Sequence, residues 1–246
     1  MYIDVHCHLD ICKDIDKIIE EVRKKKIGII ISNGVKPSVN RKILELAKKY
    51  KEVKCSMGIY PIDALALSDG EIDEEIKFIR KNKDKVTAIG EVGIDYKEDS
   101  ENWDRQKKIF RKFINLSIEL NKPIIVHSRK AEKECIEILE ELNAKKVVMH
   151  CFSGKFSLIE RISRNGWFLS IPGNVNHSEQ FQNIAKKIDI KNLLCETDAP
   201  YLHPLKERDN TPVNVIYSYK KIAELKNMKI KDVEKAIEKN YYRLFS

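Results

Sequence analysis

The sequence predicts an α/β protein of the (β/α)8 TIM-barrel class, folded as a single domain over residues 1–246. Short apolar runs recur along the chain, and each is followed by a longer segment with apolar residues at helical spacing. Eight such runs give about 31 residues per repeat, close to the total of about 250 residues that is typical of these barrels. No Pro-, Gly- or Ser-rich linker divides the chain, which favours one domain.

The expected strands are apolar on both faces, as in a parallel sheet that helices cover. They are Tyr2–His6, Ile27–Ser32, Val53–Ile59, Val86–Glu91, Pro123–His127, Lys146–His150, Trp167–Ile171 and Asn192–Glu196. The segments between them are expected to be amphipathic helices, because apolar residues recur at intervals of three and four, as in Ile15, Ile18 and Val22. An open doubly wound sheet is the alternative, but it needs a Gly-rich loop after the first strand, and this chain has His6–Asp10 there.

Composition excludes several classes of protein. With 42% hydrophobic residues and only 9 Gly and 7 Pro, the chain can bury a large core, which excludes fibrous and disordered proteins. Its longest apolar runs are far shorter than the ~18 residues of a membrane span. The first residues lack the basic and apolar segments of a secretory signal, so a cytoplasmic location is expected. The six cysteines form no CxxC pair and are expected to be small apolar residues, neither disulfides nor zinc ligands.

The charge balance of 46 basic against 38 acidic residues gives a net charge of +8, which suits a polyanionic partner. Most of the excess is lysine spread over the amphipathic segments, and Lys24–Lys26 is the one tight run. We interpret these lysines mainly as solvated helix faces, with a nucleic-acid-binding surface as the alternative.

Residue types that bind divalent metals gather where the expected strands end. Four of the six histidines and two carboxylates stand at or just beyond these ends: His6, His8, Glu91, His127, His150 and Asp198. Because barrel enzymes collect their catalytic groups at the carboxyl ends of the strands, these six side chains are expected to converge there.

Spacing within the first strand supports a metal site. His6 and His8 are two residues apart, so both imidazoles point to one face of an extended strand, while Cys7 points to the other. A lone histidine is equally well explained by a structural hydrogen bond. Four imidazoles and two carboxylates at one end of a barrel, however, are costly to bury unless cations bind them.

The donor set predicts two divalent ions; no organic cofactor is expected. Six ligands exceed what one tetrahedral ion uses, and a carboxylate can bridge two ions. Zn²⁺, Mn²⁺, Co²⁺ or Ni²⁺ suits the mixed nitrogen and oxygen donors better than Mg²⁺, which favours oxygen alone.

Five segments together carry a resemblance to a known family. They are Asp4–Leu9, Gly90–Tyr96, Pro123–Arg129, His150–Gly154 and Glu196–Leu202. In order and separation over nearly the whole chain, they resemble the TatD family of metal-dependent deoxyribonucleases, within the wider amidohydrolase-type barrels. The combination is specific for the family and much less specific for the substrate.

The resemblance implies a role for each matching residue. One ion would be held by His6, His8, Glu91 and Asp198, and Glu91 would bridge to a second ion on His127 and His150. The residues that would shape the substrate end of the site are Arg129, Arg208, Asn210 and Pro212.

Two of the candidate substrate-binding residues have alternative interpretations. Arg129 lies two residues past His127, so it is expected on the same side and could grip a phosphate; the alternative is an ion pair with Glu132 or Glu134. His203 follows Asp198 closely enough to reach the pocket, or is an ordinary loop histidine.

The chain departs from the family where the third strand ends. Many relatives carry Gly-x-His-Pro-His there, whereas this chain has Tyr60 and Ile62 in place of the two histidines. The six ligands are unaffected, but any auxiliary phosphate or third-ion role of those histidines is put in doubt. Tyr60, like Arg129, becomes a candidate for contact with the leaving or non-bridging oxygens of a phosphate.

The expected activity is hydrolysis of phosphodiester bonds in DNA by a water that two ions activate. Asp198 is the expected general base, and Glu91, the bridge, is the second catalytic carboxylate. The same centre acting on an amide, ester or aminoacyl-tRNA bond is an alternative, and so is a nucleic-acid-binding protein with structural ions. The polymerase and histidinol phosphatase class is disfavoured, because it usually ends with an Asp-x-His pair and this chain has Asp198–Pro200.

Overall fold

The computed structural model describes residues 1–206 and 209–246. Its strands are β1 (Tyr2–Cys7), β2 (Ile27–Asn33), β3 (Val53–Met57), β4 (Val86–Gly93), β5 (Ile124–His127), β6 (Val147–Met149), β7 (Phe168–Ile171) and β8 (Leu193–Cys195). They follow one another in sequence order in an eight-stranded sheet, and the pairs β1–β2, β3–β4, β4–β5, β5–β6 and β7–β8 are parallel. All eight predicted strands are present, with ends shifted by no more than two residues.

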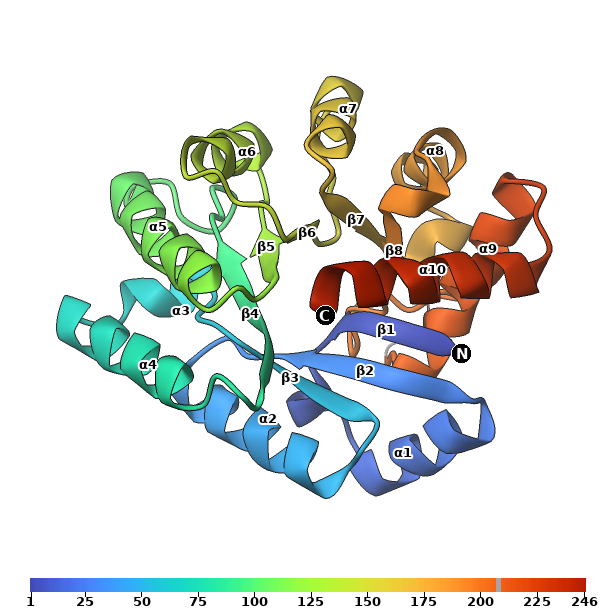
Figure 1. Ribbon diagram of the computed structural model, residues 1–246, viewed down its shortest axis with the longest axis horizontal. Coiled ribbons are helices and arrows are strands. Elements are labelled where there is room, and N and C mark those ends of the chain that lie inside the picture. The colour runs from blue at the N-terminus through green and yellow to red at the C-terminus, as the bar shows by residue number, and fades with distance from the viewer. Residues whose placement is uncertain (207–208) are drawn as a thin grey trace. The chain divides into compact units, whose positions relative to one another are not determined.

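Helices connect the successive strands, as Figure 1 shows. The α-helices are α1 (Ile15–Lys24), α2 (Pro37–Lys49), α3 (Pro61–Leu65), α4 (Asp69–Lys81), α5 (Trp103–Glu119), α6 (Glu132–Glu141), α7 (Phe156–Arg164), α8 (Glu179–Lys187), α9 (Val215–Leu225) and α10 (Ile230–Phe245). Short 3₁₀ helices are η1 (Leu9–Ile11), η2 (Gly173–Asn176), η3 (Ile190–Asn192) and η4 (Pro212–Asn214). The alternation of strand and helix confirms the predicted (β/α)8 class.

The chain forms two compact units. Unit 1 comprises Met1–Ser32, Glu45–Lys54 and Phe168–Ser246, and unit 2 comprises Asn33–Leu44 and Cys55–Trp167.

In unit 1, α9 and α10 pack on β1 and on each other (Figure 1). The hydroxyl of Tyr219 on α9 accepts a hydrogen bond from the amide of Ile3 at 2.9 Å and donates to the carbonyl of Ile3 at 3.2 Å. The ring of Tyr219 meets the ring of Tyr2 edge-on. These contacts fix β1, whose carboxyl end carries the first histidines.

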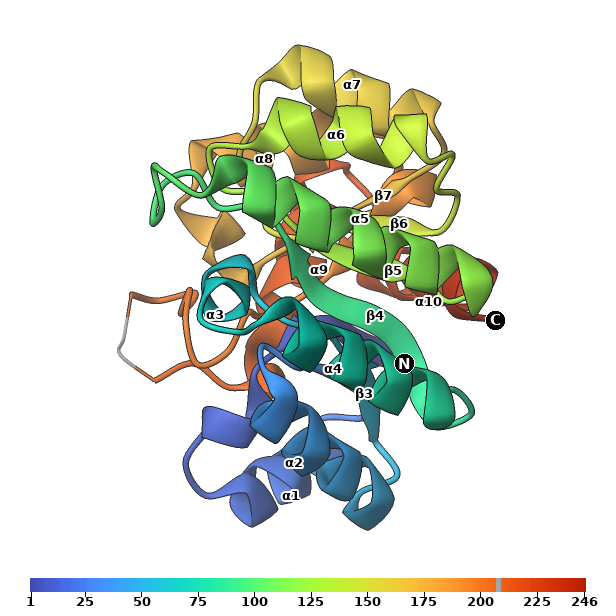
Figure 2. The ribbon, with the colours of Figure 1, turned by 90° about the vertical axis from the view of Figure 1, so that its left-hand side faces the viewer.

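In unit 2, α5 packs against β4, α3 and α4, and α6 packs against α7 (Figure 2). The packing face of α5 is apolar and includes Ile109, Phe110 and Phe113, all buried. Helix α4 begins with a capping box, in which Ser68 accepts a hydrogen bond from the amide of Glu71 and the Glu71 carboxylate accepts one from the amide of Ser68.

The cysteines are free thiols, as the sequence predicts. Cys7, Cys55, Cys135 and Cys195 are buried, and burial raises the pKa of the Cys55 thiol to about 12. Within residues 1–206 and 209–246, no helix combines the length and the hydropathy that a membrane-spanning segment has.

Candidate metal centre

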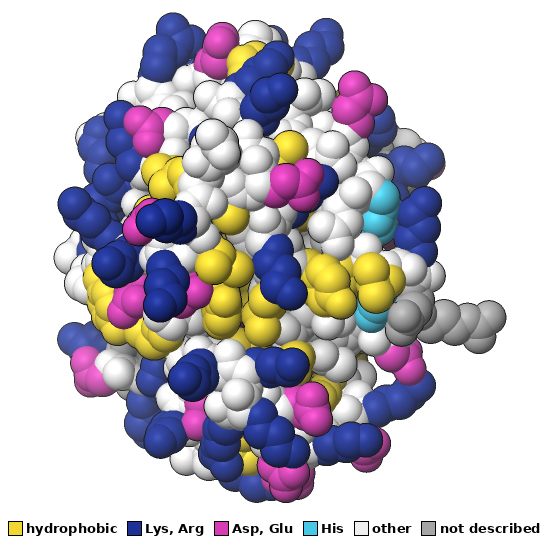
Figure 3. Space-filling model, turned by 90° about the vertical axis from the view of Figure 1, so that its right-hand side faces the viewer, with side chains coloured by type: hydrophobic (Ala, Val, Ile, Leu, Met, Phe, Trp, Pro, Cys, Tyr) yellow, Lys and Arg dark blue, Asp and Glu magenta, His cyan; other side chains and the backbone are white. Residues whose placement is uncertain are grey.

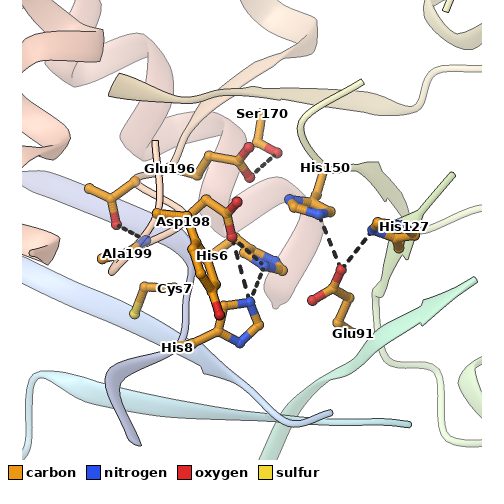
Figure 4. A network of polar contacts seen from close by, with 12 residues as sticks. His6, Cys7, His8, Glu91, His127, His150, Ser170, Glu196, Asp198 and Ala199 are labelled. Atoms are coloured by element: carbon orange, nitrogen blue, oxygen red, sulfur yellow. Dashed lines mark hydrogen bonds and ion pairs between the residues drawn. The ribbon is translucent and has the colours of Figure 1, made fainter. Parts of the chain in front are cut away.

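The first cluster of metal-ligand side chains lies in unit 1 and consists of His6, His8 and Asp198. The two Nε2 atoms are 3.4 Å apart, and they lie 3.4 Å and 3.5 Å from Oδ1 of Asp198. Figure 4 shows both imidazoles turned toward this carboxylate. The His6 side chain is fully buried, whereas those of His8 and Asp198 are 10% and 15% exposed, so solvent reaches one side of the cluster.

Hydrogen bonds between β1 and the loop after β8 bring Asp198 to the histidines. The amide of Asp198 donates to the carbonyl of His6 at 2.9 Å, and the amide of His8 donates to the carbonyl of Ala199 at 2.7 Å. Asp198 itself has a φ of 53°, in the left-handed region, which aspartate adopts more readily than most residues with a side chain. The two backbone hydrogen bonds hold the residue in this conformation.

Asp4, which sequence reasoning did not assign to the site, links β1 to the loop after β8 by hydrogen bonds to His6 and Thr197. It is fully buried, and its Oδ1 accepts hydrogen bonds from the amides of His6 and Thr197. Its Oδ2 accepts a third bond from the Thr197 hydroxyl at 2.5 Å. Burial raises the pKa of Asp4 well above its usual value, although these hydrogen bonds oppose the shift.

The spacing of the first cluster fits a divalent ion. A tetrahedral ion with bonds of about 2.0–2.1 Å holds its ligand atoms about 3.3–3.4 Å apart. An octahedral ion with the same bond length would hold neighbouring ligands about 2.9 Å apart. The three separations of 3.4–3.5 Å between His6, His8 and Asp198 thus match one face of a tetrahedron.

The second cluster lies in unit 2 and consists of Glu91, His127 and His150. Oε1 of Glu91 lies 3.0 Å from Nδ1 of His127 and 3.2 Å from Nε2 of His150, and both imidazoles face this carboxylate (Figure 4). The carboxylate oxygens of Glu91 and the imidazole nitrogens of His127 and His150 are atom types that bind divalent metals. All three side chains are at most 14% exposed.

Strand register brings the second cluster together. Gly93 on β4 is paired with His127 on β5, and the amide of His150, just after β6, donates to the carbonyl of Val126 at 3.1 Å. The side chains at the carboxyl ends of three adjacent parallel strands therefore lie side by side.

Gly93 permits the close approach of β4 to β5. It has a φ of +151°, and a Cβ atom there would lie 1.9 Å from the carbonyl oxygen of His127. No other residue fits at this position without moving the strand that carries His127.

Asp95 and Tyr60 extend the second cluster outward. Nε2 of His127 and the Tyr60 hydroxyl both lie 2.8 Å from Oδ2 of Asp95. Burial disfavours the ionised Asp95, but hydrogen bonds from His127 and Tyr60 outweigh it and hold the pKa of this carboxyl well below its usual range. Burial also opposes a charged His127, yet its bonds to Asp95 and Glu91 raise its pKa above the ordinary value. Sequence reasoning did not assign Asp95 a role, although it lies within the Gly90–Tyr96 motif.

Glu196 is a second acidic residue that sequence reasoning did not assign. It is fully buried, and its Oε2 accepts a hydrogen bond from the Ser170 hydroxyl at 2.6 Å (Figure 4). Its carbonyl accepts a bond from the Ser218 hydroxyl at 3.4 Å. The sequence feature that could have identified Glu196 is its position just after β8, two residues before Asp198.

The predicted substrate-binding residues have different surroundings. Arg129 forms an ion pair with Glu98 at 3.2 Å, an acid that was not among its expected partners, and both side chains are about half exposed. Nδ1 of His203 accepts a hydrogen bond from the amide of Leu205. Arg208 lies outside the described residues.

Asn210 holds the loop that carries Asp198. Its Nδ2 donates to the carbonyls of Thr197 and Tyr201, and its Oδ1 accepts from the amide of Thr211 and from Asn214. These four bonds use both of its amide protons and its carbonyl oxygen, and the residue is 1% exposed.

Comparison with known proteins gives consistent results. The family model described as TatD related DNase matches residues 3–246. An uncharacterized metal-dependent hydrolase of Methanocaldococcus jannaschii is 36% identical, covering 99% of this chain and 96% of the relative. The deoxyribonuclease TATDN3 of Homo sapiens is 31% identical, covering 99% of this chain and 94% of the relative.

Solved structures share the fold. The TatD homologue YJJV of Escherichia coli superposes with a TM-score of 0.93 at 24% identity, covering 99% of this chain and 97% of that one. A TatD-family hydrolase of Entamoeba histolytica superposes with a TM-score of 0.91 at 24% identity and the same coverage. With a family model that spans nearly its whole length and relatives above 30% identity, this chain belongs to the TatD family of metal-dependent hydrolases.

Proposed function

We propose that this protein is a deoxyribonuclease that hydrolyses phosphodiester bonds with two divalent ions. The observation that carries the proposal is the spacing of His6, His8 and Asp198, whose three donor atoms stand 3.4–3.5 Å apart, as the ligands of a tetrahedral ion do. Each cluster supplies three protein ligands, so a tetrahedral ion held by either one would keep a coordination position for water or substrate. The deoxyribonuclease among the relatives supports DNA as the substrate.

In this proposal each cluster would hold one divalent ion. The support is that all six ligands follow or end strands of one sheet, within or close to the carboxyl ends. Two such ions would supply an activated water and would neutralise charge on the phosphoryl oxygens.

The protein's own residues would position the reactants and move the proton. Asp198 is the proposed general base, because its carboxylate lies on the solvent-reached side of its cluster at 15% exposure. Its backbone bonds to β1 hold it in place, which favours proton transfer over a fixed short distance.

Arg129 is the proposed phosphate-binding residue. Its ion pair with Glu98 joins two half-exposed side chains, and such pairs contribute little to stability. Exchange of the Glu98 carboxylate for a substrate phosphate therefore costs little, and the guanidinium can bind two phosphate oxygens at once.

A substrate screen tests the proposal. The Mn²⁺-, Mg²⁺- and Zn²⁺-loaded proteins are assayed on single-stranded DNA, duplex DNA, RNA and a carboxylic ester. We expect DNA cleavage that Asp198→Asn abolishes and that Asp232→Asn, a change at an exposed acid on α10, leaves intact. Cleavage of the ester alone would assign the centre to carbonyl chemistry. DNA binding with steep salt dependence and no cleavage with any ion would replace the enzyme by a binding protein.

A further inference from the structure

A chain of hydrogen bonds leads away from the second cluster into unit 2. Nδ1 of His127 faces Glu91 at 3.0 Å, and Nε2 on the other side of the same ring lies 2.8 Å from Oδ2 of Asp95. The hydroxyl of Tyr60 lies 2.8 Å from the same Asp95 oxygen. His127 is thus held on both sides, by the proposed metal-binding carboxylate of Glu91 and by the carboxylate of Asp95, which is not among the proposed ligands.

The position of Asp95 fixes how the His127 ring is turned. With Nε2 directed at Asp95, Nδ1 is directed at Glu91, the side on which an ion would bind. An ion on Nδ1 would use the lone pair of that nitrogen, and Nε2 would then donate its proton to the Asp95 carboxylate. Carboxylate–histidine pairs of this kind orient the ring and strengthen its binding to metals in general.

Asp95 is itself held rigidly. Its Oδ1 accepts hydrogen bonds from the amides of Lys97 and Glu98 at 2.8 Å and 2.9 Å. Its backbone amide donates to Oε1 of Gln106, and its backbone carbonyl accepts from Nε2 of Gln106. Asp95 is fully buried and Gln106 is 1% exposed, so the acceptor that faces His127 cannot turn away without breaking several buried bonds.

Tyr60 contributes through both its hydroxyl and its ring. The hydroxyl donates to Asp95, and the ring meets the His127 ring edge-on with centroids 4.9 Å apart. The tyrosine therefore restricts rotation of the imidazole and supplies a second donor to the oxygen that orients it. This is a role for the residue that replaces a histidine of many relatives.

We propose that Asp95 and Tyr60 are positioning residues that hold the His127 imidazole with Nδ1 toward Glu91 and thereby set the metal affinity of the Glu91–His127–His150 cluster. The inference rests on the proposed binding of an ion by this cluster, and it is independent of the substrate.

Metal titration of the full-length protein tests the inference. Metal-free wild type, Asp95→Asn and Tyr60→Phe are titrated with Co²⁺ in competition with a chelator, with visible absorption as the readout. We expect Asp95→Asn to weaken one of the two binding steps by 10- to 100-fold, the range for loss of an outer carboxylate. Tyr60→Phe keeps the ring and loses the hydroxyl, so we expect about a fivefold loss at the same step. The other step, assigned to His6, His8 and Asp198, serves as the internal reference and should not change.

Matched controls and a second readout separate positioning from folding. Tyr242→Phe, at an exposed tyrosine of α10, should leave both steps unchanged. In ¹⁵N spectra of histidine-labelled, Zn²⁺-loaded protein, we expect a proton on Nε2 of His127 in the wild type and a shifted resonance in Asp95→Asn. Unchanged binding in both variants, or equal loss at both steps, would overturn the inference. Weakening at one step in a protein that cleaves no DNA would leave the inference standing and remove the proposed function.

Discussion

At the scale of single residues, the direction of a side chain decides whether it can bind an ion. His6 and Cys7 are neighbours on β1, yet the imidazole of His6 faces Asp198 and the thiol of Cys7 lies 3.6 Å from the carbonyl of Ile31 on β2. This is the alternation that the strand pattern predicted. Of these two neighbours, only His6 is therefore placed to bind an ion in the first cluster.

The metal content of two variants, measured by elemental analysis, tests whether histidines bind ions and Cys7 does not. We expect His127→Ala to lose at least one ion per chain, because one of the three donors of its cluster is gone. Cys7→Ala should keep both ions, since its sulfur contacts a backbone carbonyl within the sheet. Loss of metal from Cys7→Ala would show that the assignment of strand faces is wrong.

Arg129 allows a second prediction at this scale. Arg129→Ala should raise the KM for a phosphodiester substrate about tenfold, as loss of a charge-assisted hydrogen bond does, with metal content unchanged. Arg111→Ala, which breaks a comparable exposed ion pair with Glu141, is the control and should have no effect on KM. An equal rise in KM for a neutral substrate would point to a packing role for Arg129.

At the scale of elements, the register of neighbouring strands builds each cluster. Glu91, His127 and His150 come from three consecutive strand ends, and Asp198 reaches His6 through hydrogen bonds between the loop after β8 and β1. Small shifts of one strand along its neighbour would separate donor atoms that now lie 3.0–3.5 Å apart.

Gly93→Ala tests the importance of this register. The added Cβ would overlap the carbonyl of His127, and the φ of +151° is unsuited to alanine, so we expect a loss of about 2–4 kcal/mol in the free energy of unfolding. Metal affinity at the second cluster should fall as well. Gly70→Ala is the control, because a Cβ there meets only Ser68 Oγ at 3.9 Å in the first turn of α4, and its stability should be unchanged or slightly higher. Equal melting temperatures for the two variants would contradict the role of Gly93.

At the scale of the whole molecule, the apolar pattern of the sequence was sufficient to predict the fold class. Strand ends were predicted to within two residues because the apolar runs end where buried strands end. The six proposed ligands could be chosen from the sequence because parallel strands with helical connections all end at one edge of the sheet, and their binding of ions stays a prediction. That residues 1–246 form a single domain stays a prediction.

The supporting residues were harder to predict, because they depend on register and on loop conformation. Arg129 pairs with Glu98, which is 31 positions away in the sequence, instead of with the neighbouring Glu132 or Glu134. Asp95 acquires its partners only when β4, β5 and the segment before α3 are in place. The spacing of apolar and polar residues along the sequence does not predict such ion pairs and side-chain hydrogen bonds.

The surface charge also belongs to this scale. Figure 3 shows lysine and arginine side chains spread over one face and interleaved with acidic ones, and several lysines pair with acids on the same helix, as Lys77 does with Glu74. This agrees with the interpretation of the lysines as solvated helix faces. The net charge of +8 still favours approach of a polyanion such as DNA.

The most direct test of the two-ion proposal is an anomalous-diffraction map of the full-length protein crystallised with Mn²⁺ or Zn²⁺. We predict two peaks, one bonded to His6, His8 and Asp198 and the other to Glu91, His127 and His150. A single peak, or peaks bonded to other residues, would contradict the account.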